Sequence, residues 1–418
     1  PVLIDFPKDV QMAFVDVDEV ALSAVSPPHV QPRITPAAEL AIDQAAALLA
    51  SAERPVLVAG HGVVMAGAAP ELLRFAEASG IPVGTTLLGL GAFPDQHPQA
   101  LGMVGMHGTV QANLAMHHAD LVIGVGMRFD DRVVGRPIDF APGARIVHVD
   151  VDPGAFDRVV RADVPVLADA GLALRALTGL CDRRDRSAWW TRLRQWTGDH
   201  ERCGILDADR APLDGSPTTP EVVRALRRVT GGAATLVSDI GQHQMFMALH
   251  HGFDRPGQML TSGGLGTMGY ALPAALGAKA AEPGRPVWAI VGDGGFQMSS
   301  PELSTLVASN LPVKVLIVNN RCLGMVRQWQ ELFYDNVYSQ SILPQPSFEA
   351  LARAHGCWAT TVLRRDELEP ALRDAALHPG PAVVDVHVPM EETVYPMVPA
   401  GCVPGDVRCM DPVDASVC

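Results

Sequence analysis

The sequence predicts an α/β protein with two doubly wound parallel-sheet domains. Continuous apolar runs, several of them ending in glycine, alternate with helical segments, as expected for strands buried on both faces of a parallel sheet. This alternation occurs in residues 36–182 and again in residues 217–390. Residues 183–216 are rich in Trp and charge and then in Pro, Gly and Ser, which favours a connection between the two domains.

In the first domain, Thr35 and Pro36 predict the N-cap and the first residue of a helix that runs to about Ala52. The other helices expected in this domain lie over 71–79, near 109–118 and up to about Leu180, and its strands lie in 55–60, 81–86, 120–126, 144–152 and 164–169. The second domain is expected to hold strands in 234–241, 286–295, 312–320 and 381–388, with helices near 219–229, 268–282, 300–310 and 366–377.

The two ends of the chain differ from these domains. Residues 1–10 are predicted as a buried strand followed by a turn, so residues 1–14 look like the end of a preceding domain and the chain like a fragment. Residues 15–35 carry acids and then Ser-Pro-Pro, which is typical of a linker. Residues 391–418 are rich in Pro, Gly and Cys and are expected to form an irregular tail.

The composition excludes several classes of protein. The chain has 418 residues, of which 48% are hydrophobic, and a net charge of −14. Such a charge repels nucleic acid unless a basic patch overrides it, and we interpret the arginines in 183–186 and 227–228 as solvated faces. No segment reaches the roughly 20 apolar residues of a membrane span. The seven cysteines form no CxxC pair, which favours a reducing cytoplasm over a disulfide framework or a zinc site.

Polar residues follow two strands of the second domain. Asp293 lies between Gly292 and Gly294 after one strand, and Asn320 ends the next strand along the chain. Parallel strands end at the same edge of a sheet, so the two side chains are expected to converge there. Oxygen ligands of this kind, completed by phosphate oxygens, suit Mg²⁺. The alternative is a glycine-rich turn with a chance Asn pair, which the strands before both motifs disfavour.

With these residues in place, the chain resembles the thiamine diphosphate enzymes, whose motif is Gly-Asp-Gly followed by Asn-Asn. The segment Gly324–Gln330 (GMVRQWQ) narrows the resemblance to the acetohydroxyacid (acetolactate) synthases. The resemblance implies that Asp293 and Asn320 are side-chain ligands of Mg²⁺ and that the main-chain carbonyl of Cys322 is the third protein ligand. The residues implied to bind thiamine diphosphate are Gly241, Gln242, His243, Gly266, Met268, Gly292, Asp293, Gly294, Gly295 and Asn320.

The resemblance also assigns three apolar residues to the catalytic site. Met268 is implied to lie under the thiazolium ring of the cofactor, and Met325 and Trp329 are implied to line the pocket of the acceptor keto acid. The residues alone leave an alternative open, in which Met325, Trp329 and Leu332 are simply the core face of a helix.

The segment RFDDR (128–132) supplies a further residue of the implied catalytic site, in addition to the three apolar residues. By resemblance, Arg132 pairs with the carboxylate of the acceptor, a task that suits a planar guanidinium. The alternative is a surface cluster of ion pairs that satisfies itself and contributes little energy.

Residues 89–135 resemble the FAD-binding stretch of these synthases. Gly105–Thr109 opens a helix whose exposed N–H groups suit a pyrophosphate, and Asp150 ends a strand, where a carboxylate can meet a ribose. The FAD would be structural, because the implied reaction has no net redox change; the alternative is a domain that has lost its nucleotide. The residues implied to bind FAD are Gly60, Gly62, Thr86, Leu87, Leu88, Met106, His107, Gly108, Thr109, Arg128, Asp150 and Asp169.

The activity that the resemblance implies is that of an acetolactate synthase. Such an enzyme decarboxylates pyruvate on thiamine diphosphate and ligates the hydroxyethyl carbanion to pyruvate or 2-ketobutyrate, the first common step toward valine, leucine and isoleucine. The implied enzyme is a cytoplasmic homodimer or tetramer with a possible small regulatory subunit. Two alternatives remain: another FAD-containing thiamine enzyme (glyoxylate carboligase or pyruvate oxidase), or a non-catalytic chain that binds thiamine diphosphate and FAD.

One catalytic group is expected to lie outside this sequence. In the family, a glutamate of the N-terminal pyrimidine-binding domain forms the thiamine ylide, and that domain precedes the segment seen here at residues 1–9. We therefore expect the chain alone to be inactive. The resemblance ends near Gly401, beyond which residues 402–418 depart from the family pattern.

Overall fold

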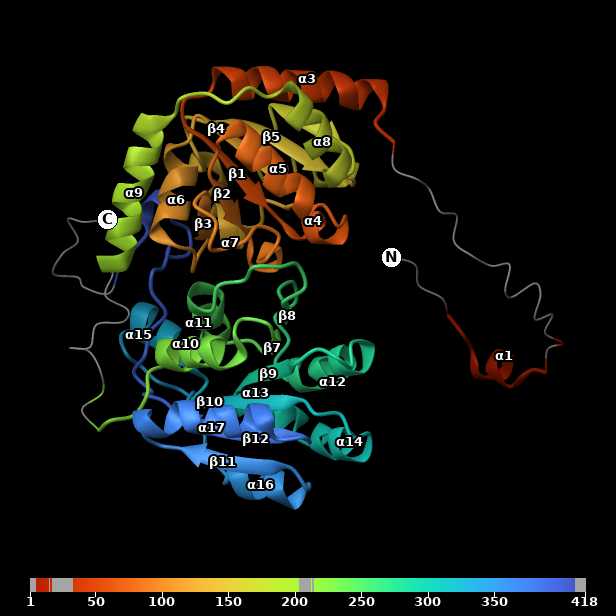
Figure 1. The fold of residues 1–418 in the computed structure, drawn as a ribbon, viewed down its shortest axis with the longest axis vertical. Helices are drawn as coiled ribbons and strands as arrows, with labels where there is room; N and C mark the ends of the chain where they lie inside the picture. The colour runs from red at the N-terminus through yellow and green to blue at the C-terminus, as the bar shows by residue number, and fades with distance from the viewer. Residues whose placement is uncertain (1–4, 15, 17–32, 203–211, 213, 410–418) are drawn as a thin grey trace. The chain divides into compact units, whose positions relative to one another are not determined.

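The computed structural model describes residues 5–14, 16, 33–202, 212 and 214–409 (Figure 1). The chain divides into two units, residues 1–33 and 34–418. In the described part of the chain, no helix is long and apolar enough to cross a membrane.

The described part of the first unit contains a short helix where we expected a strand and a turn. This helix, α1, spans Lys8–Met12 and buries none of its residues. Pro7 caps its start with extended backbone, and Asp9 lies in its first turn, where a negative charge stabilises the helix dipole. Helix α1 stands where the turn was expected, and residues 5–7 before it are exposed and have no regular structure, so the buried strand does not reach them. Residues 1–4, which begin the expected strand, lie outside the described residues.

The second unit holds two six-stranded parallel sheets, which confirms the predicted fold class. The strands of the first sheet run in the order β3-β2-β1-β4-β5-β6. They are β1 (Pro55–Ala59), β2 (Val83–Thr85), β3 (Ala100–Met103), β4 (Leu121–Val125), β5 (Arg145–Asp150) and β6 (Val164–Leu167). The main helices around this sheet are α3 (Pro36–Ser51), α4 (His61–Met65), α5 (Ala69–Ser79), α6 (Val110–His118), α7 (Asp131–Val134) and α8 (Ala170–Leu180).

Strand β1 explains why helices cover both faces of this sheet. All five of its residues are buried. Leu57 and Ala59 pack in the core that α3, α5 and α8 share, whereas Val56 and Val58 pack on the opposite face with α6. A strand with apolar residues at every position is stable only between two layers of helices.

The second sheet has the order β11-β12-β10-β9-β7-β8. Its strands are β7 (Thr235–Ser238), β8 (Met259–Thr261), β9 (Val287–Gly292), β10 (Lys314–Asn319), β11 (Trp358–Val362) and β12 (Ala382–His387). Its helices are α10 (Thr219–Thr230), α11 (Gln242–His250), α12 (Ala271–Ala281), α13 (Asp293–Ser299), α14 (Glu302–Ala308), α15 (Gly324–Phe333), α16 (Phe348–Ala354) and α17 (Arg365–Leu377). The chain order reverses between β7 and β9, so the crevice of this sheet lies at their carboxyl ends.

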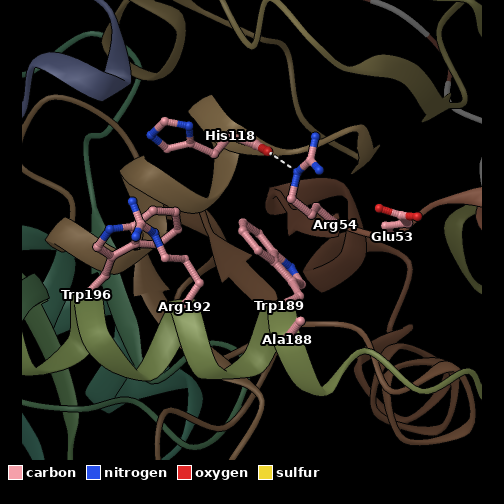
Figure 2. A pocket seen from close by; sticks show the side chains of 7 residues that line it. All are labelled: Glu53, Arg54, His118, Ala188, Trp189, Arg192 and Trp196. Carbon is pink, nitrogen blue, oxygen red and sulfur yellow. Dashed lines mark hydrogen bonds between the residues drawn. The ribbon is translucent and has the colours of Figure 1, made fainter.

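The expected connection between the domains contains a long helix, α9 (Ser187–Arg202). Among the side chains that the structure describes in α9, Trp189, Leu193 and Trp196 are buried, and they pack with the core around α6 (Figure 2). Figure 1 shows α9 alongside α6. The three residues recur at intervals of three and four, so one face of α9 covers the sheet domain.

Our interpretation of Arg186 as part of a solvated face is wrong. Its side chain is buried and donates to the carbonyls of Ser79 at 2.9 Å and Leu49 at 3.0 Å. These carbonyls belong to the last turns of α5 and α3. The carbonyl groups of a last turn have no partner within their own helix. Arg184, two residues away, is exposed as expected.

Arg227 and Arg228, which we also interpreted as a solvated face, are solvated only in part. Arg227 donates to the carbonyl of Gly252 and lies 2.8 Å from the carboxylate of Asp254. Arg228 is exposed and pairs with Glu369 at 2.6 Å.

The described part of the tail, residues 391–409, joins the two sheet domains. Its irregular backbone was expected, and a bridge between Met397 and Arg408 and a short 3-10 turn at Pro404–Asp406 are its regular features. Val394 is buried against the second sheet, whereas Val398 and Val407 are buried in the core of the first. The tail therefore contributes to both hydrophobic cores.

Replacing Arg186 with Ala is expected to lower the free energy of unfolding by about 2–3 kcal/mol, because two buried helix-end carbonyls lose their donor. Arg184→Ala is the matched control and should change stability by no more than about 0.5 kcal/mol. Urea denaturation followed by circular dichroism measures both values. Equal stability of the two variants would contradict the role given to Arg186.

Candidate functional site

The carboxyl ends of β9 and β10 carry the predicted metal ligands. Asp293 begins α13 and is buried, with 2% of its surface exposed. Burial raises the pKa of its carboxyl from 3.8 to about 6, and the side-chain amide of Gln345 donates to it at 2.5 Å. A buried carboxylate without a cation is costly, so this position favours a positive ligand.

Asn320 lies in the turn after β10. Its side-chain oxygen accepts a hydrogen bond from the N–H of Cys322 at 3.3 Å, which joins the two residues within this turn. Burial raises the pKa of the Cys322 thiol to about 12, so the thiol stays protonated. The prediction that this residue acts through its main chain therefore agrees with the chemistry of its side chain.

The segments that follow β9 and β10 lie against each other. A Cβ atom on Gly294 would stand 3.0 Å from the side chain of Leu323 and 3.5 Å from the terminal methyl of Met268. Because Gly294 has no side chain, both the loop after β10 and Met268, which is predicted to lie under the thiazolium ring, can approach it closely. Three segments that are distant in the sequence meet at this glycine.

The loop after β7 brings the next two predicted residues to the same place. Gly241 has a φ of +145° and precedes α11, where Gln242 and His243 are both buried. The ring of His243 would lie 3.1 Å from a Cβ on Gly292. Burial lowers the pKa of His243 to about 4, so its imidazole is neutral, and its buried Nε2 has no partner among the described residues. An unpartnered ring nitrogen beside the glycine turn can serve a polar ligand.

Asp239 was missed by the sequence analysis. Its carboxylate accepts hydrogen bonds from the backbone N–H groups of Gly269 at 3.0 Å and Tyr270 at 3.1 Å. It thereby fixes the end of the glycine-rich segment 262–270 against β7. The sequence does hold a feature that could have identified Asp239, because its carboxylate directly follows a buried strand. Asp293 was identified by the same feature.

The glycine-rich segment itself is open. Gly266 has a φ of +66°, and a Cβ on it would meet nothing within 4 Å. Leu265 beside it is 94% exposed. The segment just before Met268 is therefore exposed and not packed against the rest of the domain.

The GMVRQWQ segment forms helix α15, but not as an ordinary core helix. Its buried residues are Arg327 and Gln328, whereas Leu332 is exposed. Met325 packs at the edge of the core of the second sheet, and the ring of Trp329 lies 4.9 Å from that of Phe333. The alternative of a Met–Trp–Leu core face is therefore wrong.

Gln328 is a second residue that sequence reasoning missed. Its side-chain oxygen accepts from the side-chain amide of Gln242 and from the N–H of Val394, both at 2.9 Å. The amide of Gln242 also donates to the carbonyl of Glu392 at 2.7 Å. These bonds join α15, α11 and the tail behind the predicted metal ligands.

The RFDDR segment has the features of a loose surface cluster. Arg128 lies 3.5 Å from Asp130, and Arg132 lies 3.8 Å from Asp131, with both arginine side chains about two-thirds exposed. Asp130 caps α7 by accepting from the N–H of Arg132. Apart from this ion pair with Asp131, the guanidinium of Arg132 contacts the sulfur of Met106, at 3.7 Å, so most of its donors remain available.

The predicted FAD residues gather at the carboxyl edge of the first sheet. Gly60 and Gly62 follow β1 and pack against the backbone of Gly126 after β4. Asp150 ends β5, and Asp169 follows β6 and caps α8. The remaining residues of this set lie in the segments after β2 and β3, at 86–88 and 106–109, and at Arg128.

The start of α6 differs from our expectation of exposed N–H groups. The N–H groups of Gly108 and Thr109 donate to the carbonyls of Gly105 and Met103 at 2.8 Å each, and the hydroxyl of Thr109 caps Ala112. The expectation failed because Thr109 is the N-cap of α6, and the turn before it is closed on itself.

Gly324→Ala is expected to weaken Mg²⁺-dependent binding of thiamine diphosphate by about tenfold or more. Its new Cβ would collide with the side-chain oxygen of Gln242 and stand 2.5 Å from the amide of Asn320. The control is Gly277→Ala on the exposed face of α12, where a Cβ meets nothing within 4 Å. That variant should keep its affinity and gain about 0.5–1 kcal/mol of stability. Calorimetric titration measures the affinities, and unchanged binding in Gly324→Ala would contradict the geometry.

Two family models match the chain. The model described as thiamine pyrophosphate enzyme, central domain, matches residues 42–177. The model described as thiamine pyrophosphate enzyme, C-terminal TPP binding domain, matches residues 239–386. The first match covers all six strands of the first sheet, and the second begins directly after β7 and covers the rest of the second sheet up to the next-to-last residue of β12.

Curated relatives agree with these models. The chain is 42% identical, over 98% of its length and 66% of the relative, to the acetolactate synthase large subunit of Corynebacterium glutamicum. It is 41% identical to the probable acetolactate synthase large subunit of Methanocaldococcus jannaschii, with 96% of this chain and 68% of the relative covered. For the isozyme 3 large subunit of Escherichia coli the identity is 39%, over 95% of this chain and 70% of the relative. The chain therefore spans about two thirds of the length of these relatives, and it belongs to the acetolactate synthase large-subunit family of thiamine diphosphate enzymes.

Proposed function

We propose that this chain forms the central and cofactor-binding parts of an acetolactate synthase, which decarboxylates pyruvate and joins the remaining two-carbon unit to a second 2-keto acid. The observation that carries the proposal is the meeting of Asp293, Asn320, Gln242 and His243 at the crevice of the second sheet. The names and identities of the relatives give independent support.

The residues at this crevice fit a metal-bound diphosphate. The carboxylate of Asp293, the side-chain oxygen of Asn320 and the carbonyl of Cys322 would hold Mg²⁺, because all three offer the hard oxygen atoms that this ion prefers. The cation would offset the cost of burying the carboxylate of Asp293. Gln242 and His243 would bind beside the diphosphate, and the unpartnered Nε2 of His243 supports this role.

Met268 and the residues of α15 would shape the reaction site. Thiamine diphosphate supplies the electron sink that lets a 2-keto acid lose CO₂. Met268 would lie under its flat ring, since the side chain already reaches Gly294. Met325 and Trp329 would line the acceptor pocket and exclude water from it, because both present partly buried apolar groups on one side of α15.

Arg132 would pair with the carboxylate of the acceptor. Its guanidinium makes one long ion pair and is mostly exposed, so it can exchange that contact for a bidentate pair with a substrate carboxylate.

FAD is the cofactor that we assign to the first sheet. Three buried polar atoms in this region have no partner among the described residues: the hydroxyl of Thr85, Nδ1 of His107 and the side-chain oxygen of Gln111. Such atoms are normally satisfied, so they fit a polar ligand at this edge. The bound flavin would be structural and take no part in the carbon–carbon bond formation.

The assembly and the location of the protein are also part of the proposal. We propose a homodimer or tetramer with a small regulatory subunit, since relatives are named large subunits. A cytoplasmic location is supported by the free thiols of Cys181, Cys322, Cys357 and Cys402, although Cys409 is disulfide-bonded.

The test is acetolactate formation from pyruvate with thiamine diphosphate, Mg²⁺ and FAD. It is run on this chain and on a fusion that supplies, from the Corynebacterium glutamicum relative, the N-terminal region that the chain does not span. The fusion should form acetolactate and the chain alone should not, because we expect the ylide-forming glutamate in the added region. Cofactor binding without acetolactate from the fusion would contradict the proposal. Oxygen uptake would indicate an oxidase instead.

A pair of variants ties the activity of the fusion to this chain. Arg132→Gln should raise KM for the acceptor about tenfold or more, because the carboxylate loses a bidentate partner. Arg136→Gln is the control, since Arg136 is similarly exposed and pairs with Asp139 at 2.6 Å. An equal effect of both substitutions on KM would contradict the assignment of Arg132 to the acceptor site.

A further inference from the structure

Strand β12 carries a carboxylate within a run of apolar residues. Its sequence is AVVDVH, and five of its six residues are buried. The acidic residue is Asp385, whose surface is 3% exposed. Burying a carboxylate is costly unless it has hydrogen-bonding partners, and Asp385 is not among the residues that we assign to the cofactor. Its position therefore points to a task that an apolar residue could not perform.

Asp385 lies beside the end of β10. In the parallel register of β10 and β12, Asn319 is the partner of His387. Side chains two residues apart on a strand share a face, so Asp385 lies on the same face of the sheet as both. The side-chain amide of Asn319 donates to the carboxylate of Asp385 at 3.0 Å, and the ring of His387 lies 3.5 Å from that carboxylate. Asn319 is 2% exposed, so its bond to Asp385 is shielded from water.

The same amide of Asn319 supports the turn after β10. Its oxygen accepts a hydrogen bond from the N–H of Arg321 at 3.2 Å. Arg321 has a φ of +58°, a left-handed conformation that few residues other than glycine adopt, so this turn depends on its supports. Because the nitrogen of the amide is bonded to Asp385, the oxygen of the amide is directed toward the turn.

This turn presents two of the three proposed metal ligands. Asn320 precedes Arg321 and Cys322 follows it. The N–H of Cys322 donates to the side-chain oxygen of Asn320 at 3.3 Å, so a shift of the backbone at Arg321 would move both ligands together. Mg²⁺ requires a nearly ideal octahedron of ligands at about 2.0–2.1 Å. A small shift of this turn would therefore weaken the binding of the metal.

We propose that Asp385 is a positioning residue for the proposed Mg²⁺ site: it holds the side chain of Asn319, which fixes the turn that presents Asn320 and the carbonyl of Cys322. The inference rests on the proposed function. It gives the two adjacent asparagines different tasks, since Asn320 is the proposed ligand and Asn319 connects the turn to β12. Replacing a residue that orients metal ligands typically changes metal affinity about 10–100-fold.

The test measures how much Mg²⁺ the full chain needs to bind thiamine diphosphate, by calorimetric titration of thiamine diphosphate at a series of Mg²⁺ concentrations. Asp385→Val and Asn319→Ala should each raise the Mg²⁺ concentration for half-maximal binding about tenfold or more. The double variant should need little more Mg²⁺ than either single variant, because both substitutions break the same connection. Val suits this position, since the residues on either side of Asp385 are valines.

The variant Asp385→Asn separates position from charge. Burial and, to a smaller extent, the charge of Asp385 raise the pKa of Asp293, so the loss of a nearby charge is the alternative explanation for weaker binding. In Asp385→Asn the charge is removed, but the amide oxygen can still accept from Asn319. This variant should therefore recover most of the affinity for Mg²⁺ that Asp385→Val loses.

Lys314→Met is the control on the same strand. Lys314 is buried at the opposite end of β10 and donates to the carbonyls of His378 and Gly380 at 2.6 Å each. Its replacement removes buried hydrogen bonds and should lower the free energy of unfolding. It should leave the Mg²⁺ requirement unchanged, because the turn after β10 keeps its supports. Urea denaturation followed by circular dichroism measures the stability of every variant.

The outcomes separate this inference from the proposed function. If the unchanged chain shows no Mg²⁺-dependent binding, the proposed site fails and the inference fails with it. If the unchanged chain binds, and folded Asp385→Val and Asn319→Ala need no more Mg²⁺ than it does, the inference alone is overturned. A loss in Asp385→Asn or in Lys314→Met equal to that in Asp385→Val would also contradict the positioning role of Asp385.

Discussion

The side-chain amide of Gln242 is the interaction on which the geometry of the candidate cofactor site depends. Its nitrogen donates to the side-chain oxygen of Gln328 and to the carbonyl of Glu392, and its oxygen accepts from the amide of Asn320. One residue at the start of α11 thus holds the turn after β10, helix α15 and the tail. Because these groups are buried or partly buried, an unsatisfied partner would be costly, so the network favours one arrangement.

The tail extends this constraint to the rest of the second unit. The carboxylate of Glu392 accepts from the N–H of Thr219 at the start of α10, and burial raises its pKa to about 7. Farther along, the N–H of Val398 donates to the carbonyl of Met106 at 2.7 Å, beside residues that we assign to FAD. The tail therefore forms hydrogen bonds with both sheet domains.

Much of this arrangement could be predicted from the sequence because buried parallel strands carry a strong signal. β9 and β10 are apolar at nearly every position, and their polar residues begin where the strands end, so Asp293 and Asn320 could be placed at one edge. Strand β8 was missed because its three residues are only partly buried and lack that pattern. The interior bonds of Asp239, Gln328 and Arg186 were missed because each depends on a partner that is distant in the sequence.

Local signals were weakest where tertiary contacts decide the structure. Helix α9 has charged residues on its outer face, so its composition is typical of a connection between domains. Its role in the core depends on the packing of Trp189 and Trp196 against α6. The start of α6 looked like an anion site because of its glycines, but those glycines close a turn on the N-cap Thr109. Residues of the same type serve backbone geometry in one place and ligand binding in another, and only the partners distinguish them.

The most direct test of the account is calorimetric titration of thiamine diphosphate into the chain with and without Mg²⁺, repeated on Asp293→Ala and Asn320→Ala. Asp374→Ala is the control, because Asp374 is exposed on α17. The unchanged chain and the control should bind only with Mg²⁺ present, and both site variants should lose that binding because the diphosphate loses its metal clamp. Unchanged affinity in either site variant, with the fold intact, would contradict the assignment of this sheet edge as the cofactor site.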